Sequence, residues 1–380
     1  MKFLFIAGCL EKGRDGVGDY TRCLAGELVK HGHEVSILAI NDLFIAEVVT
    51  ESVPIGNSKI SLFRIPSNFS AQKWFEKAEA FVQQQNPDII SLQFVPFSFH
   101  KKGLPFGLSK RLAKLGKGKD WQIMFHELWV GMDAEASIKS RWWGEVQRLL
   151  IRDLIQRLRP KVIHTQTNLY KVQLEKMGFA VKTLSLFSNI PREKSTNEAV
   201  ANVQKKLEGV DITELALFAS IHPGAPVEDF AKEVAEITKS ENRIIHLLLI
   251  GRSGPEQTRW AETWKRFGLS LTILEEQSAE MISRKLSEAS VGVSTTPLAQ
   301  IEKSGAVAAM REHNLPILCV SRSWSPKGIE GLAVASDVFE YKKGNLATIL
   351  KPNFKFSSSY KPVAEIAKQF IEDISRAVIA

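Results

Sequence analysis

The sequence predicts an α/β protein with two parallel sheets that are covered by helices. Short apolar segments alternate with amphipathic ones along nearly the whole chain, which is the pattern of repeated βαβ units. The first segment, residues 2–7, is a continuous apolar run, as expected for a central parallel strand. The alternation stops at the polar residues 188–207 and then restarts, so we expect a linker there and a domain on each side.

The first half contains one series of these units. Its strands are expected at residues 2–7, 34–40, 61–64, 88–93, 121–125, 162–165 and 181–186. Its helices are expected at residues 20–30, 70–85, 104–115, 137–159 and 168–177. A glycine-rich loop, residues 13–19, follows the first strand, at the end of a parallel strand where open α/β sheets bind ligands.

The second half repeats the pattern. Its strands are expected at residues 215–220, 244–250, 271–274, 291–293 and 317–320. Its helices are expected at residues 227–240, 256–267, 279–289, from about 304, and at 363–378.

The helix that opens near Ser304 starts with small residues, including Gly305 and Ala306. Its free backbone amides and the positive end of its dipole would attract a phosphate group. The same small residues also fit an ordinary βαβ unit in which they only allow close packing.

Composition narrows the classes of function. The chain has 380 residues, 44% of them apolar, and a net charge of +8, so anionic partners are plausible. Cys9, Cys23 and Cys319 lack metal-ligand spacing and suit buried thiols in a reducing compartment. The apolar run at residues 3–10 is short for a signal peptide, and no stretch reaches the roughly 20 apolar residues of a membrane span. We therefore expect a cytoplasmic or peripheral protein.

Four segments carry a resemblance to a known family. They are GVGDYTRCLAGELVKHGHEV at residues 16–35, MFHELW at 124–129, LLLIGRSGP at 247–255 and EKSGAVAAM at 302–310. Over nearly its whole length the chain resembles the retaining glycosyltransferases of the GT-B fold, family 4 type. The resemblance implies two Rossmann-like domains facing each other across a cleft, with the C-terminal helix crossing back to the first domain. The expected domains are an acceptor domain, residues 1–187 plus 363–380, and a nucleotide-sugar donor domain, residues 188–362.

The resemblance also implies a set of site residues. Glu302 matches a family glutamate near the donor sugar hydroxyls, and His126 matches a family histidine that contacts that sugar. A histidine that only caps a strand end is the alternative for His126. The expected nucleotide-sugar-binding residues are Gly16, Gly18, Asp19, Ser220, His222, Arg252, Glu276, Lys303, Ser304, Gly305, Ala306 and Val307.

The chain departs from the family pattern at two places. The second family glutamate, which holds the nucleotide ribose, is replaced by Met310, with Glu312 two residues further on. The usual Arg and Lys after the first strand of the second domain are missing, and we expect Arg252, Lys303 and His222 to substitute for them. For Arg252 a solvated surface arginine is an equally good interpretation. No Asp-x-Asp motif occurs, so we expect a metal-independent site with no cofactor besides the donor substrate.

A basic segment, residues 101–119, has no acidic residue and interleaves Phe and Leu with positive charges. Such a surface suits anionic lipid headgroups, and a solvated helix face is the alternative. No nucleic-acid-binding module accompanies it. Its basic residues are Lys101, Lys102, Lys110, Arg111, Lys114, Lys117 and Lys119.

The resemblance thus implies a transferase that moves a hexose to a glycan or polyprenyl-linked saccharide with retention. UDP-glucose is the default donor because UDP-sugars are common in the family. We expect a role in exopolysaccharide or cell-envelope polysaccharide synthesis, in the cytoplasm or at the inner membrane face. The alternatives are a degenerate, non-catalytic sugar-nucleotide-binding subunit and a GT-B phosphorylase or epimerase.

Overall fold

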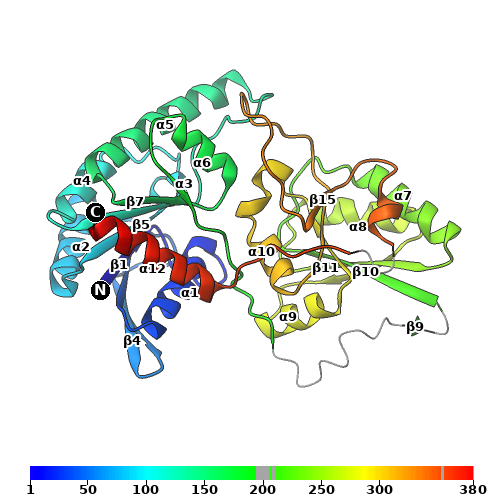
Figure 1. Cartoon of the computed structure of the whole chain (residues 1–380), viewed down its shortest axis with the longest axis horizontal. Helices are drawn as coiled ribbons and strands as arrows, with labels where there is room; N and C mark the ends of the chain where they lie inside the picture. The colour runs from blue at the N-terminus through cyan, green and yellow to red at the C-terminus, as the bar shows by residue number, and fades with distance from the viewer. Residues whose placement is uncertain (194–205, 208–209, 352–354, 380) are drawn as a thin grey trace. The chain divides into compact units, whose positions relative to one another are not determined.

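The chain forms two compact units. A computed structural model describes residues 1–193, 206–207, 210–351 and 355–379 (Figure 1). Unit 1 consists of Met1–Ser185, Pro326–Glu330 and Lys361–Ala380, and unit 2 consists of Leu186–Ser325 and Gly331–Tyr360. Most of the expected linker, residues 194–205, lies outside the described residues.

The sheet of unit 1 has the strand order β3-β4-β2-β1-β5-β6-β7-β8. All its neighbouring strands are parallel except β3, which pairs antiparallel with β4 and was not predicted. In β3, intermediate and exposed residues alternate, and Pro54 lies within it, as is typical of an edge strand. The bounds are β1 (Lys2–Ala7), β2 (Glu34–Asp42), β3 (Val49–Ile55), β4 (Ser58–Pro66), β5 (Ile89–Phe94), β6 (Asp120–Phe125), β7 (Val162–Thr165) and β8 (Lys182–Thr183).

The first helix of unit 1 begins earlier than predicted. It starts at Gly16 instead of residue 20, because the Asp15 side chain caps it by accepting from the amide of Val17. The short α3 was not predicted, and α4 begins later than the expected residue 104. The bounds are α1 (Gly16–Lys30), α2 (Ala71–Gln85), α3 (Pro96–Phe99), α4 (Leu108–Leu115), α5 (Ile138–Leu158), α6 (Asn168–Glu175) and α12 (Val363–Ile379).

The C-terminal helix α12 belongs to unit 1 and packs on its sheet. Figure 1 shows α12 beside β1. The ring of Phe370 lies 5.8 Å from that of Phe3 and 6.0 Å from that of Phe5, measured between centroids. Both partner residues are on β1. The two ends of the chain therefore lie in the same unit.

The sheet of unit 2 has the order β12-β11-β10-β13-β14-β15, and β9 pairs antiparallel with β10. A 3₁₀ helix that was not predicted, η1 (Leu298–Lys303), lies between β13 and α10. The strands are β9 (Lys206–Leu207), β10 (Val210–Phe218), β11 (Ile244–Ile250), β12 (Ser270–Leu274), β13 (Val291–Ser294), β14 (Ile317–Cys319) and β15 (Val338–Glu340). The α-helices are α7 (Val227–Ser240), α8 (Glu256–Arg266), α9 (Ala279–Glu288), α10 (Gly305–Glu312) and α11 (Leu346–Ile349).

Unit 2 has a core on each face of its sheet. Alternate residues of β10 point to opposite faces, so Leu215 and Leu217 join one core and Ala216 joins the other. The first core contains Trp260 and Trp264 of α8, and the second contains Met310 of α10. The carboxyl ends of the strands, which carry most candidate residues, thus rest on well-packed layers.

Candidate functional site

The N-terminus of α10 presents open backbone amides. Ser304 caps the helix, and its Oγ accepts from the amide of Val307 at 3.3 Å. Among the described residues no acceptor is paired with the amides of Gly305 and Ala306. A Cβ placed on Gly305 would meet nothing within 4 Å, so a ligand has room to approach this turn.

Three basic side chains lie near one another in unit 2, and one of them, Lys303, directly precedes the residue that caps α10. Burial lowers the pKa of His222, and the positive charges of Lys303 and Arg322 lower it further, so both lie near its ring. The backbone of His222 is held by the Thr295 hydroxyl, which accepts its amide proton at 2.8 Å. A helix N-terminus with two cations, Lys303 and Arg322, and the neutral imidazole of His222 in the same unit is well suited to bind phosphate. The sequence reasoning named His222 and Lys303 but missed Arg322.

Arg252 and Glu276 contact each other. The Arg252 guanidinium donates to both carboxylate oxygens of Glu276, with its Nε at 2.9 Å from Oε2. Both side chains are exposed, so solvent screens their attraction and the pair is weak. Arg252 could neutralise a phosphate only after this weak pair opens. Ser220, two residues after the end of β10, is also exposed.

The position of the second family glutamate lies in the core. The Met310 side chain is fully buried, and a Cβ on Gly292 of β13 would be 2.6 Å from its Sδ. Glu312 accepts a hydrogen bond from the hydroxyl of Tyr360. Met310 therefore cannot contact a ribose from this position. Glu302, the first family glutamate, is half-buried and lies near the end of η1.

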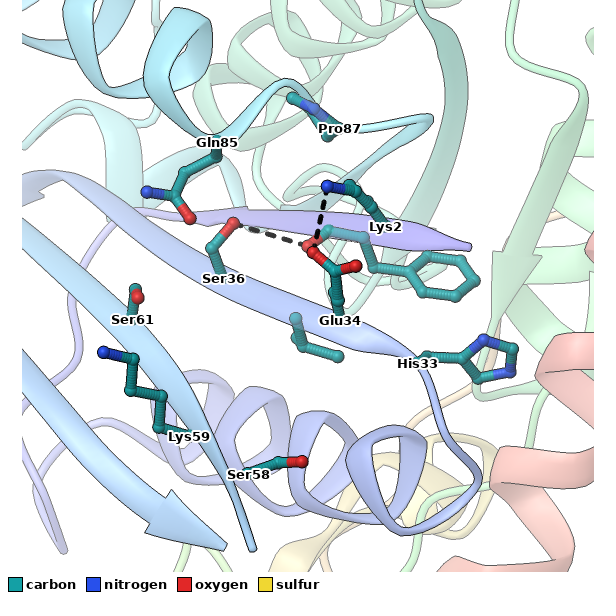
Figure 2. A pocket seen from close by; sticks show the side chains of 11 residues that line it. Lys2, His33, Glu34, Ser36, Ser58, Lys59, Ser61, Gln85 and Pro87 are labelled. Carbon is teal, nitrogen blue, oxygen red and sulfur yellow. Dashed lines mark hydrogen bonds and ion pairs between the residues drawn. The ribbon is translucent and has the colours of Figure 1, made fainter.

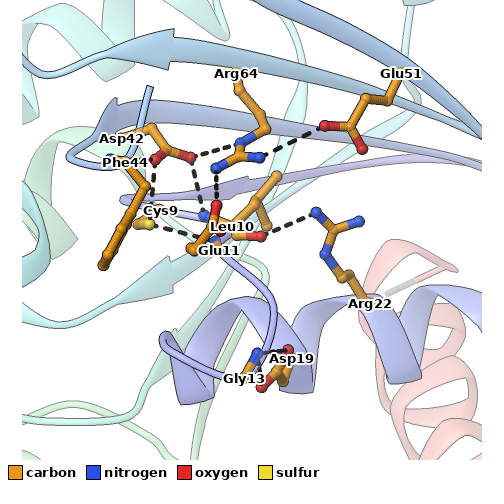
Figure 3. Close-up of polar contacts among 10 residues, drawn as sticks. All are labelled: Cys9, Leu10, Glu11, Gly13, Asp19, Arg22, Asp42, Phe44, Glu51 and Arg64. Carbon is orange, nitrogen blue, oxygen red and sulfur yellow. Dashed lines mark hydrogen bonds and ion pairs between the residues drawn. The ribbon is translucent and has the colours of Figure 1, made fainter. Parts of the chain in front are cut away.

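The N-terminus of α1 in unit 1 is occupied by the chain's own carboxylates. The amide of Gly13 donates to both Asp19 oxygens, at 3.1 and 3.3 Å (Figure 3). The amide of Val17 donates to Asp15. Burial raises the pKa of Asp15 to about 6, against the hydrogen bonds from Val17 and Gly18. This negative charge disfavours a phosphate beside Gly16, Gly18 and Asp19, although carboxylates can accept from sugar hydroxyls.

A buried ion-pair cluster lies close to this turn. Arg64 of β4 donates to Asp42 and to Glu11, each at 2.7 Å, and its Nη1 lies 3.5 Å from Glu51 (Figure 3). A Cβ on Gly18 would be 3.0 Å from the carbonyl oxygen of Cys9. Gly18 therefore allows α1 to pack closely on the strand end.

His126 follows β6 and is 5% exposed. Its Nε2 lies 2.9 Å from Gln93 Oε1, and its Nδ1 lies 2.9 Å from Gln166 Nε2. Tyr20 of α1 packs edge-on against the ring at a centroid distance of 4.8 Å. Burial lowers the pKa of His126 to about 3, which the hydrogen bond from Gln166 only partly opposes. The ring is therefore neutral, and the structure brings it beside the start of α1.

A cavity of about 300 Å³ lies at the opposite, amino-terminal edge of the unit 1 sheet (Figure 2). Lys2, Glu34 and Lys59 contribute to its lining, and none of the candidate site residues does. Ligands of open α/β sheets bind at the carboxyl edge, so we do not assign it to the site. In the described ranges no group of three or more His, Cys, Asp or Glu could hold a metal ion.

The basic segment, residues 101–119, is only partly an apolar surface. Leu108, Leu112 and Leu115 of α4 are buried, whereas Phe97 and Phe106 are exposed. The neighbouring α5 adds an exposed apolar stripe that the sequence reasoning missed, formed by Ile138, Trp142 and Leu149. The Trp143 indole donates to the Lys102 carbonyl at 2.9 Å, which ties α5 to the segment.

Across the part of the chain that the structure describes, no helix has the length and apolar character needed to cross a membrane.

Comparison with known proteins identifies the fold. No protein-family model and no curated protein sequence matches the chain. Among solved structures, HepE of Anabaena in complex with UDP-glucose is similar, with 12% identity, a TM-score of 0.61 and coverage of 99% of this chain and 100% of that one. The lipopolysaccharide outer core galactosyltransferase WaaB is also similar, with 12% identity, a TM-score of 0.53 and coverage of 100% and 99%. A UDP-N-acetylglucosamine 2-epimerase from Rickettsia bellii is similar as well, with 14% identity, a TM-score of 0.52 and coverage of 99% of this chain and 96% of that one. The chain therefore has the GT-B fold over its whole length.

Proposed function

We propose that the protein is a nucleotide-sugar-dependent glycosyltransferase. In this proposal it moves a hexose, with UDP-glucose as the default donor, to a glycan or lipid-linked oligosaccharide with retention and without a metal. The observations that carry the proposal are the open N-terminus of α10 and the three basic side chains that lie near one another in the same unit, Lys303, His222 and Arg322. The departing group in glycosyl transfer is a nucleoside diphosphate, and a fixed set of amides and cations stabilises the charge that develops on it.

The comparisons support this choice of substrate class. HepE was solved with UDP and with UDP-glucose, and WaaB is described as a galactosyltransferase. In this proposal Glu302, at the end of η1, contacts the donor sugar, and the missing Arg/Lys pair is replaced by Arg322 together with His222 and Lys303. The product would belong to exopolysaccharide or cell-envelope polysaccharide synthesis.

We also propose that unit 1 contacts an anionic membrane surface that carries the acceptor. The basic segment, residues 101–119, supplies the charge, and the exposed side chains of Phe97, Phe106 and Trp142 supply apolar contacts. Such contacts would hold the protein peripherally at the inner face of the membrane.

Two alternative functions have specific support. The burial of Met310 leaves the ribose without its usual glutamate, which favours a non-catalytic sugar-nucleotide-binding subunit. The similarity to an epimerase favours chemistry on the nucleotide sugar without an acceptor.

A nucleotide-binding experiment tests the proposal. We expect UDP to raise the thermal unfolding temperature more than GDP or ADP does, because a ligand that binds only the folded state stabilises it by mass action. Incubation with UDP-glucose, followed by chromatography of the products, separates the alternatives. Released UDP together with free glucose or a glycoside supports a transferase, a new UDP-sugar supports an epimerase, and unchanged UDP-glucose despite binding supports a non-catalytic subunit. If none of UDP, GDP and ADP binds, the assignment of a nucleotide site to unit 2 is contradicted.

A further inference from the structure

A line of buried polar side chains runs through unit 1 from His126 to the C-terminal helix. Each member is at most 8% exposed, although the surrounding sheet is apolar. Buried polar groups of this kind are costly unless every one is hydrogen-bonded. The members, in order, are Gln166, His126, Gln93, Ser91, Gln122, His164 and Asp373.

The sheet places these side chains on one face. Ser91 and Gln93 are two residues apart on β5, and Ser91 pairs with Gln122 of β6 in the parallel register. His126 is four residues after Gln122 and continues the same face. His164 of β7 completes the line, and α12 covers it because Phe370 packs tilted against the His164 ring at 5.9 Å.

The contacts are continuous from end to end. Gln93 Nε2 donates to Ser91 Oγ at 2.7 Å, and Ser91 Oγ donates to Gln122 Oε1 at 2.5 Å. Gln122 Nε2 lies 3.0 Å from His164 Nδ1, and His164 Nε2 lies 3.1 Å from Asp373 Oδ2. The other oxygen of Asp373 accepts from Lys182 Nζ at 2.6 Å. At the other end of the line, His126 contacts Gln93 through Nε2 and Gln166 through Nδ1.

The carboxylate at one end fixes the direction of every bond. Burial opposes ionisation of Asp373, but the hydrogen bonds from His164 and Lys182 outweigh it and lower its pKa, so it can only accept. His164 Nε2 must then carry a proton. Burial lowers the pKa of His164, against the influence of Asp373, so the ring is neutral and its Nδ1 accepts.

The same logic passes along the rest of the line. The Gln122 amide must turn its NH₂ toward His164 and its oxygen toward Ser91. Ser91 therefore donates to Gln122 and accepts from Gln93, whose oxygen faces His126. The neutral His126 is left with a proton on Nε2 and a lone pair on Nδ1.

We propose that Asp373 is a positioning residue for His126. Through this one-way line, with Lys182 holding its second oxygen, it fixes His126 as the Nε2–H tautomer with Nδ1 as an acceptor. The consequence for ligand binding rests on the proposed function. An acceptor nitrogen accepts a hydrogen bond from a hydroxyl and repels a phosphate oxygen. Of the groups of a nucleotide sugar, a sugar hydroxyl can therefore replace Gln166 at this nitrogen.

Nuclear magnetic resonance of ¹⁵N-histidine-labelled protein without nucleotide reads the tautomers directly. The couplings between ring protons and ring nitrogens identify the protonated nitrogen, and spectra of His126→Asn and His164→Asn assign the two rings among the eight histidines. We expect both rings to carry the proton on Nε2 in the wild type. In Asp373→Asn, Lys182 attracts the new amide oxygen, so the amide NH₂ faces His164. Each bond of the line then reverses, and the proton moves to Nδ1 in both rings.

Glu372→Gln is the matched control, because it removes a neighbouring carboxylate that pairs only with Arg376 among the contacts of α12 described here. It should leave both tautomers unchanged. Ser91→Ala cuts the line in the middle, so His164 should keep its tautomer while His126 becomes a mixture.

The proposal is overturned if wild-type His126 carries its proton on Nδ1, or if Asp373→Asn leaves His126 unchanged. If Asp373→Asn does not fold, the Ser91→Ala variant decides instead. The proposal is then overturned if His126 gives the same spectrum in Ser91→Ala as in the wild type. The affinity for UDP is measured separately, so a failure of the donor site is distinguished from a failure of this inference.

Discussion

Arg322 follows β14 and provides a positive charge beside His222. Burial lowers the pKa of His222 first, and the neighbouring cations lower it further because two close positive charges disfavour each other. We expect Arg322→Gln to raise this pKa toward its ordinary value, measured by a nuclear magnetic resonance titration. The same variant should bind UDP at least about tenfold more weakly, since a charged hydrogen bond contributes about 1.5–3 kcal/mol.

Arg284→Gln removes the same charge from an exposed arginine of α9 and serves as the control. It should change neither the pKa of His222 nor the affinity for UDP in isothermal titration calorimetry. Wild-type UDP affinity in Arg322→Gln would exclude Arg322 from the phosphate site.

Met310 and Arg322 show what the sequence could not supply at this scale. The spacing from Glu302 placed the family departure at residue 310, but only packing shows that this side chain fills the space under Gly292. Arg322 lies in a segment without a motif, far in the sequence from His222. Its role depends on the order of β10, β13 and β14 in the sheet, which brings their carboxyl ends together.

The helices α1 and α10 offer a direct comparison at the scale of elements. Each begins with a glycine, Gly16 or Gly305, and a Cβ on either would meet nothing within 4 Å. Their dipoles are alike, but their surroundings differ in charge, because the carboxylates of Asp15 and Asp19 occupy the first turn of α1. The two helix starts should therefore differ in their affinity for a phosphate.

Substitution of these two glycines tests the difference. Gly305→Val should weaken UDP binding at least tenfold, because the side chain occupies the space through which phosphate reaches the open amides. Gly16→Val should leave the affinity nearly unchanged. Calorimetry gives both affinities, and thermal unfolding without nucleotide confirms that each variant is folded. The reverse result, with only Gly16→Val losing affinity, would move the phosphate site to unit 1.

The elements that the sequence predicted are those with strong local signals. Continuous apolar runs predicted β1, β5 and β11. A central parallel strand is buried on both faces, so its sequence is apolar whichever strands lie beside it. The short β15 and α11 were not predicted. Their few residues fold by packing on the rest of unit 2, and so they carry little pattern of their own.

At the scale of the whole molecule, the alternation of strands and helices predicted the fold class, and the similarity to HepE and WaaB confirms the GT-B fold. The donor, the acceptor and the retention of configuration stay predictions. They depend on a few side chains, such as Glu302 and His126, whose ligand contacts neither sequence pattern nor fold similarity determines.

The net charge of +8 and the basic segment of unit 1 lead to the last prediction, which concerns binding to membranes. The protein should sediment with vesicles of anionic lipid at low salt and not with neutral vesicles. Each basic residue near such a surface contributes about 1 kcal/mol. Replacing the exposed Lys110, Lys114 and Lys117 by Glu should therefore weaken binding by about a hundredfold or more. High salt should act in the same direction, because charges are screened over roughly 8 Å at physiological ionic strength.

The control variant reverses the charge of three exposed lysines on α7 and α8 of unit 2, and it should still bind to anionic vesicles. These lysines are Lys232, Lys239 and Lys265. Equal loss in both triple variants would mean that only the total charge matters, and a wild type that ignores anionic vesicles would make a soluble acceptor the better proposal.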